Sequence, residues 1–296
     1  MGHYGLLLSA LLPEIRFEKD FSLALHTTVG VGGNTAAFLP LSRAQLFSVV
    51  RLCERCNVRY FPLGGGSNVL PADSGFDGVI LSTSAFDGVS VDGEHLTAEC
   101  GVGVGKLLSV CKRRQLTGLE FLAGIPAKVG GLTYMNAGTA DGHVGDCIES
   151  VTFLRAGKVY TYTKEQCQFS YKTTVFQQFP CVILSVRFAL KKAQEGEVFE
   201  NISRMLEKRK HLPTGKSMGC TFKNPTVDLS AGKLIEDCNL KGFRVGGAVV
   251  SPQHANFILN DSHATAQDYI SLIEHIKRTV RQQTGVRLEE EIRYIR

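Results

Sequence analysis

Three consecutive glycines, Gly64-Gly65-Gly66, follow a short apolar segment from Arg59 to Leu63 and lead into Ser67 and Asn68. The apolar segment has the composition of a strand, so the glycines form the turn at its end. Successive glycines can expose several backbone N–H groups to one anion, and Ser67 and Asn68 add side-chain donors. The sequence therefore predicts a loop suited to a diphosphate. On residue types alone, a tight structural turn is an equally good interpretation.

Helical and strand-like patterns are mixed along the rest of the chain. Apolar residues recur at helical spacing in four segments, Arg43–Cys56, Val104–Cys111, Val198–Leu206 and Ala266–Thr284. The last of these begins with the capping box Thr265/Asp268 and ends at Gly285. Strands are expected at Val79–Leu81, Val151–Leu154, Lys158–Tyr162, Val182–Leu190, Val245–Val250 and Phe257–Leu259, at a hairpin around Asp92-Gly93, and from Val286 to Tyr294.

Glycine is also frequent between Gly118 and Gly145, where we expect backbone that approaches a ligand rather than a helix. The polar, charged stretch from Lys191 to Glu197 is the expected domain boundary. With 296 residues, the chain is long enough for two domains, which we place at residues 1–195 and 196–296.

Charge and composition exclude several classes of protein. The formal charge of +5 comes from 33 basic and 28 acidic residues without a clustered basic stripe, so a nucleic-acid partner is not expected. The apolar stretch from Leu6 to Leu12 is too short and interrupted to be a signal peptide or a membrane span, which needs about 20 apolar residues. Nine scattered cysteines suit reduced thiols in a cytoplasm. No obligate protein partner is evident.

Three short motifs could be mistaken for functional sites. Cys53 and Cys56 form a C-x-x-C within a helical pattern, without a second ligand pair, so no metal site is predicted. Gly215-Lys216-Ser217 lacks the first glycine of a triphosphate loop, because Lys210 stands there. Gly101-Val102-Gly103 lacks the third glycine of a dinucleotide fingerprint, because Lys106 stands there.

An ordered series of motifs resembles the UDP-N-acetylenolpyruvoylglucosamine reductase family over nearly the whole chain. The series begins with residues 26–34 (HTTVGVGGN) and the loop at 62–70 (PLGGGSNVL). It continues with 118–121 (GLEF), 124–126 (GIP), 130–131 (GG), 135–138 (MNAG), 169–172 (FSYK), 219–225 (GCTFKNP), 231–235 (AGKLI), 254–257 (HANF) and 291–293 (EIR). Each motif is weak alone, but their order is specific.

The resemblance implies an α+β fold, in which a FAD-binding PCMH domain of the vanillyl-alcohol-oxidase type precedes an α/β domain typical of this family. It implies a cytoplasmic enzyme in peptidoglycan synthesis that uses FAD and NADPH. NADPH would reduce the flavin, which would then deliver hydride to C3 of the enolpyruvyl group of a UDP-linked amino sugar while a protein acid protonates C2. The implied cofactor-binding residues are Gly64, Gly65, Gly66, Ser67, Asn68, Gly124, Ile125, Gly130, Gly131, Asn136, Ala137 and Gly138.

The resemblance also implies three catalytic residues, Lys172, Cys220 and Glu291. Lys172 stands where the family usually has arginine, so the charge is kept while the bidentate fork that grips a carboxylate is lost. Cys220 stands where the family usually has the proton-donating serine, and a thiol with an ordinary pKa near 8.5 is a competent acid. Glu289 is predicted on the same strand face as Glu291 and is its natural control.

Substrate-binding roles are expected for Tyr171, Lys210, Asn224, Lys233 and His254, although a solvated surface position is the alternative for each lysine. Two further interpretations stay open. One is a flavin oxidase or dehydrogenase of the same fold with a different substrate. The other is a nucleotide-binding module that has lost catalysis.

Overall fold

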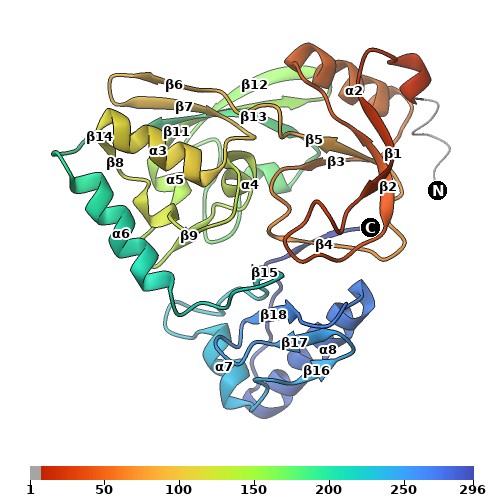
Figure 1. Ribbon diagram of the computed structural model, residues 1–296, viewed down its shortest axis with the longest axis vertical. Coiled ribbons are helices and arrows are strands. Elements are labelled where there is room, and N and C mark those ends of the chain that lie inside the picture. The colour runs from red at the N-terminus through yellow and green to blue at the C-terminus, as the bar shows by residue number, and fades with distance from the viewer. Residues whose placement is uncertain (1–7) are drawn as a thin grey trace.

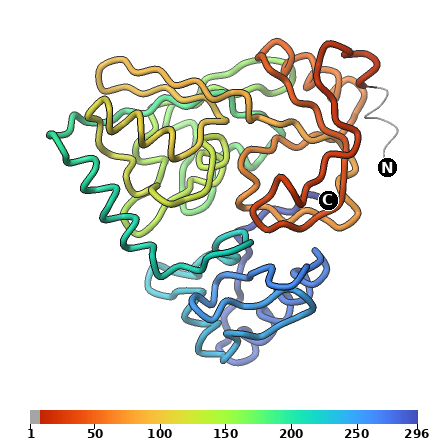
Figure 2. The backbone as a smooth tube through the Cα atoms, in the orientation of Figure 1, coloured from red at the N-terminus to blue at the C-terminus, as the bar shows by residue number. Residues whose placement is uncertain are grey.

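The computed structural model describes residues 8–296, so the start of the apolar stretch Leu6–Leu12 lies outside the described residues. A larger body holds the first two thirds of the chain, and a smaller body holds most of the remainder (Figure 1). The tube drawing shows the chain passing between them near the end of the long helix at the left and returning close to the C-terminus (Figure 2). Within the described range, no helix is both long and apolar enough to cross a bilayer.

Two sheets build the larger body. The first has the order β1-β2-β5-β3, in which β2, β5 and β3 are parallel. Its strands are β1 (Phe17–Ser22), β2 (Asn34–Phe38), β5 (Val79–Ser82) and β3 (Tyr60–Leu63). The second is antiparallel and has the order β12-β11-β13-β7-β6. Its strands are β12 (Lys158–Thr163), β11 (Ile148–Arg155), β13 (Val182–Ala189), β7 (His95–Glu99) and β6 (Val89–Asp92).

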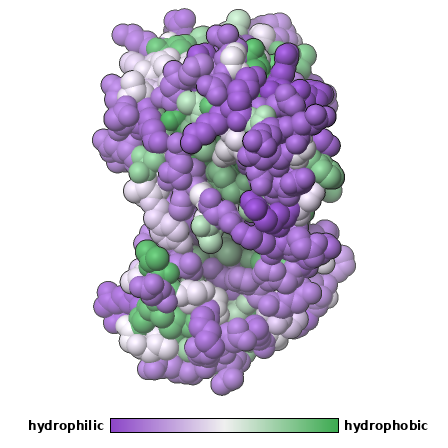
Figure 3. Space-filling view, turned by 90° about the vertical axis from the view of Figure 1, so that its left-hand side faces the viewer, coloured by the Kyte–Doolittle hydropathy of each residue, from purple (hydrophilic) through white to green (hydrophobic). Residues whose placement is uncertain are grey.

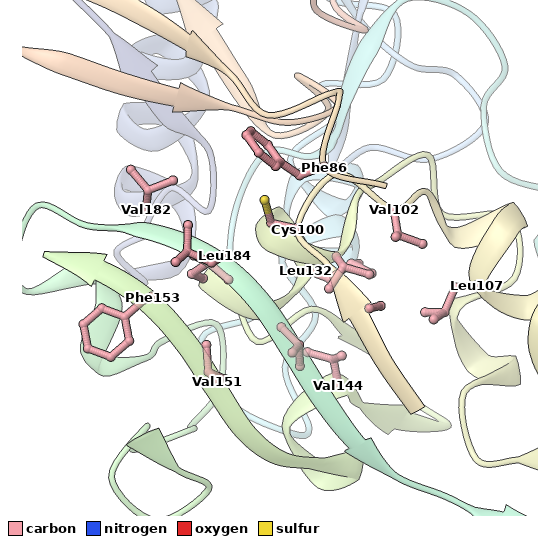
Figure 4. Packing of buried hydrophobic residues seen from close by; sticks show 14 of the residues in the cluster. Phe86, Cys100, Val102, Leu107, Leu132, Val144, Val151, Phe153, Val182 and Leu184 are labelled. Carbon is pink, nitrogen blue, oxygen red and sulfur yellow. The ribbon is translucent and has the colours of Figure 1, made fainter. Parts of the chain in front are cut away.

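Helices cover these sheets and bury one continuous core between them. The helices are α2 (Arg43–Arg55), α3 (Val104–Arg114), α4 (Val129–Tyr134), α5 (Val144–Cys147) and α6 (Glu197–Arg209), with 3-10 turns η1 (Glu120–Leu122) and η2 (Val175–Gln177). Figure 4 shows Phe153 and Leu184 from the second sheet beside Phe86, Cys100 and Leu132 in this core. Short pairs β8 (Leu116–Thr117) with β14 (Lys191–Lys192) and β9 (Gly138–Thr139) with β10 (Gly142–His143) complete the body.

Helix α4 differs from the loop expected for the glycine-rich stretch. Its Gly130 lies directly against Cys100, because a Cβ built on Gly130 would be 3.0 Å from the Cys100 Cβ. The Gly130 N–H donates to the Cys100 carbonyl at 2.8 Å. The glycine here permits close packing of a short helix on the sheet, which outweighs its low helix propensity.

Helix α6 belongs to the core of the larger body. Its Val198 and Met205 are buried in that core, and the helix packs against η1 and α3. The chain therefore passes to the smaller body after Arg209, later than the boundary expected at Lys191–Glu197. The charged stretch forms the short strand β14 and an exposed turn, and it is followed by a helix that still packs on the larger body.

The smaller body is an antiparallel sheet, β15-β18-β17-β16, packed against two helices. The strands are β15 (Ser217–Cys220), β18 (Phe257–Asn260), β17 (Ala248–Val250) and β16 (Arg244–Val245), and the helices are α7 (Ala231–Asp237) and α8 (Ala266–Thr284). Helix α8 has the predicted capping box and ends at Gly285, whose φ of 76° is left-handed. The predicted strand Val286–Tyr294 is wrong for most of its length, since only β19 (Arg293–Ile295) forms, by pairing with β4 (Val69–Pro71) of the larger body.

Asp73 joins the two bodies by capping α8 from the larger one. Its carboxylate accepts hydrogen bonds from Ala266 N at 2.8 Å and from Gln267 N at 3.1 Å. These N–H groups have no partner within the helix. The negative charge of the carboxylate also interacts favourably with the positive N-terminal end of the helix dipole.

Replacing Asp73 with alanine is expected to lower the free energy of unfolding by about 1 kcal/mol, because two helix N–H groups lose their acceptor. Urea unfolding followed by circular dichroism measures this change. Asp228→Ala, at an exposed position, is the control. Equal stabilities of the two variants would contradict the capping role.

Candidate active site

The glycine loop lies between β3 and β4 and forms one wall of a large cavity. The cavity has a volume of about 1470 Å³ and extends from this loop to the junction of the two bodies. In the space-filling view, apolar and pale residues lie recessed at the waist between the bodies (Figure 3). Ligand pockets commonly have about 300–1,000 Å³, so this cavity has room for a dinucleotide and a second ligand.

The backbone of the loop is arranged as an anion cradle. Among residues 8–296, none of the five N–H groups from Gly64 to Asn68 donates to a protein acceptor. Gly66 has a left-handed φ of 62°, and a Cβ there would lie 2.3 Å from the His26 carbonyl oxygen, so only glycine fits. Unpaired N–H groups in succession suit the two phosphates of FAD. The residues present therefore fit this cofactor.

The second glycine-rich segment faces the same cavity. With one exception, every predicted cofactor-binding residue lines it, namely Gly64, Gly65, Gly66, Ser67, Asn68, Gly124, Ile125, Gly130, Gly131, Ala137 and Gly138. The exception is Asn136, whose side chain is buried. Its amide donates to Ser170 O at 2.8 Å and accepts from Gly145 N at 2.9 Å. Asn136 thus ties the segment to the loop that carries Lys172.

Lys172, Cys220 and Glu291 come together where the two bodies meet, and all three line the cavity. Lys172 Nζ lies 2.9 Å from Glu291 Oε1, and the two side chains are only 14% and 12% exposed. Lys172 has a left-handed φ of 57°, which costs a residue with a side chain about 1–2 kcal/mol. Strain of this kind clusters at functional sites, and here it brings the ammonium to Glu291.

Backbone pairing after α8 brings Glu291 to Cys220. Glu291 N donates to Thr221 O at 2.8 Å, and Arg293 N donates to Asn68 O at 3.0 Å. The Asn68 side chain also donates to Glu291 O at 3.3 Å. The same short segment therefore bonds to the residue that follows Cys220 and to the glycine loop, so it links Cys220, the predicted proton donor, to the cofactor cradle.

The predicted substrate residues are less closely grouped. Lys210 and His254 line the cavity, but Lys210 is largely exposed and paired with Glu207. Burial lowers the pKa of His254, whose ring Nδ1 accepts from Asn256 N at 3.2 Å, so the ring is neutral at pH 7. Tyr171 and Asn224 do not line the cavity, and they bond to each other, because Asn224 N donates to the Tyr171 hydroxyl at 3.1 Å. Lys233 lies outside the cavity as a solvated lysine paired with Asp237 at 2.7 Å.

Arg209 is a cavity residue that the sequence reasoning missed in favour of Lys210. No carboxylate among the described residues lies within 4.0 Å of Arg209, and its side chain packs over Gly124, where a Cβ would be 3.2 Å from the Arg209 Nε. A signal for it was present, because Val198, Ile202, Met205 and Arg209 follow helical spacing on one face. Lys210 is one position beyond this face and points to solvent.

Burial raises the pKa of the Cys220 thiol to about 12, and the negative charge of Glu291 adds to this rise. Lys172 and Arg209 act in the opposite direction. The expectation that the Cys220 thiol has an ordinary pKa is therefore wrong, because its pKa is raised. Cys220 holds its proton throughout the physiological range, which suits a donor and not a nucleophile.

Iodoacetamide is expected to alkylate Cys220 at pH 7.5 at least about a hundredfold more slowly than an unperturbed thiol, because so little thiolate forms. The rate should keep rising about tenfold per pH unit beyond pH 9. Peptide-resolved mass spectrometry measures it, with the exposed Cys56 reporting that the reagent is active. A rate at Cys220 that levels off below pH 9 would disprove the raised pKa.

Among the described residues, no three His, Cys, Asp or Glu side chains gather in a way that could hold a metal ion. The C-x-x-C pair is split, because Cys53 is buried on the inner face of α2 and Cys56 is exposed at its end.

Comparisons with known proteins agree with this geometry. Residues 23–161 match the model of an FAD binding domain, and residues 210–295 match the C-terminal domain of UDP-N-acetylenolpyruvoylglucosamine reductase. A solvent-stable cholesterol oxidase, 16% identical with a TM-score of 0.50 over 60% of this chain and 38% of its own, shares the fold of the FAD-binding part. The predicted α+β fold of the vanillyl-alcohol-oxidase type is thereby confirmed.

Two relatives match over nearly their full length. The UDP-N-acetylenolpyruvoylglucosamine reductase of Clostridium botulinum is 35% identical over 99% of this chain and 97% of its own. The crystal structure of UDP-N-acetylenolpyruvylglucosamine reductase (MurB) from Thermus caldophilus superposes with a TM-score of 0.83 at 33% identity, covering 95% of this chain and all of that one. The chain therefore belongs to the UDP-N-acetylenolpyruvoylglucosamine reductase family.

Proposed function

We propose that this protein reduces UDP-N-acetylglucosamine enolpyruvate to UDP-N-acetylmuramate, with NADPH as the reductant and FAD as the cofactor. The reaction would serve peptidoglycan precursor synthesis in the cytoplasm. One observation carries the proposal. The buried cluster of Lys172, Cys220 and Glu291 opens into the same cavity as the anion cradle at Gly64–Asn68.

The chemistry explains why these residue types are needed. When bound, FAD accepts hydride from NADPH and passes it to C3 of the enolpyruvyl group. Negative charge then builds at C2 and on the neighbouring carboxylate, so the site needs fixed positive charge and a proton donor. Lys172 supplies the charge, and Glu291 holds the Lys172 ammonium in position at 2.9 Å.

Cys220 provides the proton. A carbanion beside a carboxylate is a far stronger base than a thiolate, so transfer from the thiol to C2 is favourable even with the raised pKa. The thiolate that remains is stabilised by Lys172 and Arg209, whose charges lower the pKa of Cys220. One hydride and one proton thus add across the double bond, and solvent restores the thiol.

Arg209 is proposed to bind the substrate carboxylate. Its guanidinium can form the two parallel hydrogen bonds that Lys172 cannot, and no carboxylate within residues 8–296 is paired with it. The nearby Lys210 is already paired with Glu207.

Arg209→Met is expected to raise KM for the enolpyruvyl substrate about tenfold or more, because a charge-assisted contact is lost. Reduction of the flavin by NADPH should be unaffected. Lys210→Met is the matched control, since it removes a neighbouring charge that is already paired with Glu207. Steady-state kinetics at varied substrate concentrations measures both. An unchanged KM in Arg209→Met would remove Arg209 from the substrate site.

Product analysis tests the proposed reaction. The purified protein is incubated in D₂O with NADPH and the enolpyruvyl nucleotide, and the product is examined by mass spectrometry. The proposal requires one deuterium at C2 from solvent. The hydrogen added at C3 comes from the reduced flavin, so it is protium or deuterium according to how far the flavin N–H has exchanged with D₂O before transfer. Recovery of unchanged substrate from flavin-loaded protein would refute the proposed activity.

A further inference from the structure

Lys128 lies against the glycine loop, in a position that no motif singled out. A Cβ built on Gly64 would be 3.7 Å from the Lys128 Cβ and 3.9 Å from its Cδ. A Cβ on Gly65 would be 3.7 Å from the Lys128 Cγ and 3.5 Å from Pro126 O. The aliphatic stem of Lys128 therefore packs along the loop, and its ammonium is two bonds beyond the Cδ.

The Lys128 ammonium is hydrogen-bonded to a neutral side chain. Its Nζ donates to Ser84 Oγ at 2.8 Å, and no carboxylate in the described part of the chain lies within 4.0 Å. The charge of Asp87 acts on Lys128 from a distance and raises its pKa, but the Asp87 carboxylate is itself paired with Lys106 at 2.7 Å. Lys128 is half-buried, and this burial lowers its pKa. A partly desolvated cation without a counter-ion is unfavourable unless a ligand supplies the anion.

The surroundings of Lys128 point to an anion at one place. Lys128 and the five unpaired N–H groups of Gly64–Asn68 line the same cavity. An ammonium has three donors, and Ser84 occupies only one of them. The N–H groups carry only partial positive charges. They do not neutralise a diphosphate, which has two negative charges.

We infer that Lys128 supplies the counter-charge for the diphosphate of the bound dinucleotide. The inference rests on the proposed function only in taking that dinucleotide to be FAD. It assigns the second segment, at Pro126–Lys128, a direct electrostatic role. Recognition of the diphosphate then comes from two loops that face each other, one with N–H groups and one with a full charge.

Lys128→Met tests this, because it keeps the stem that packs on the glycines and removes the charge. The full-length protein is freed of flavin by dialysis against bromide, and refolded secondary structure is verified by circular dichroism. Fluorescence titration then measures the Kd for FAD and for riboflavin, which lacks the diphosphate. The expected result is a Kd for FAD raised about tenfold or more, and an unchanged Kd for riboflavin.

Two comparisons separate charge from packing. Lys128→Arg should keep FAD affinity close to that of the wild type. Lys106→Met, which removes a nearby lysine that does not line the cavity, should bind FAD as the wild type does. The FAD affinity of the wild type should also fall more steeply than that of Lys128→Met between roughly 50 and 500 mM NaCl.

Each other outcome has a distinct meaning. An unchanged FAD affinity in Lys128→Met, or an equal loss for FAD and riboflavin, would overturn the role of Lys128 and leave the proposed function standing. Failure of the wild-type protein to bind FAD at all would overturn the proposed function and this inference together.

Discussion

Replacing Cys220 with alanine is expected to slow reoxidation of the reduced flavin by substrate by about 10²–10⁴-fold, the usual contribution of a positioned general acid. The thiol lies in the cavity beside Lys172 and Glu291. Its raised pKa keeps it protonated until the carbanion at C2 accepts the proton. Flavin reduction by NADPH should keep its rate. Anaerobic stopped-flow absorbance resolves the two half-reactions.

Two variants make this result specific. Cys220→Ser should recover much of the lost rate, because a hydroxyl can also donate a proton. Cys238→Ala removes a buried thiol of the smaller body that does not line the cavity and should leave both half-reactions unchanged. Equal rates of substrate-dependent reoxidation in Cys220→Ala and wild type would exclude Cys220 as the acid.

Lys172→Met is expected to lower the rate of the same half-reaction by about 10²–10³-fold, because a preorganised charge at the developing carbanion is lost. The change also leaves the Glu291 carboxylate buried and unpaired, which reverses the local charge. Lys172→Arg should be active, since arginine keeps the charge and adds a bidentate fork. Single-turnover reoxidation by substrate measures all three proteins.

A neighbouring ion pair offers a matched control for this prediction. Lys223, which follows β15, pairs with Glu289 on the segment that also carries Glu291, but Glu289 is 73% exposed. Breaking this pair with Lys223→Met or Glu289→Gln should change the rate little, because solvent screens exposed charges. If Lys223→Met were as slow as Lys172→Met, the effect would come from the segment and not from the Lys172 charge.

Local signals in the sequence predicted the secondary structure that positions the site. The capping box at Thr265 and the glycine at position 285 bound α8 as expected, and the strand before Gly64 ends where the glycines begin. Each of these features is decided by a few adjacent residues. Such features can be identified without knowledge of the fold.

Long-range features could not be predicted from periodicity. The alternation from Val286 to Tyr294 predicted one strand. Only its last residues find a strand to pair with, which is β4. The residues before them form isolated hydrogen bonds to the segment that follows β15. The ion pair between Lys172 and Glu291 joins two domains. The family resemblance predicted both residues, but nothing in the sequence predicted that they contact each other. Lys233 was assigned to the substrate from its motif, yet α7 turns it to solvent.

An anaerobic absorbance titration of the purified protein tests most directly whether its flavin passes reducing equivalents to the enolpyruvyl substrate. Bound flavin is first bleached with NADPH, and the UDP-linked enolpyruvyl sugar is then added. We expect the oxidised flavin spectrum to return on addition of one equivalent of substrate. Flavin that stays reduced after the substrate is added would contradict the proposed reaction.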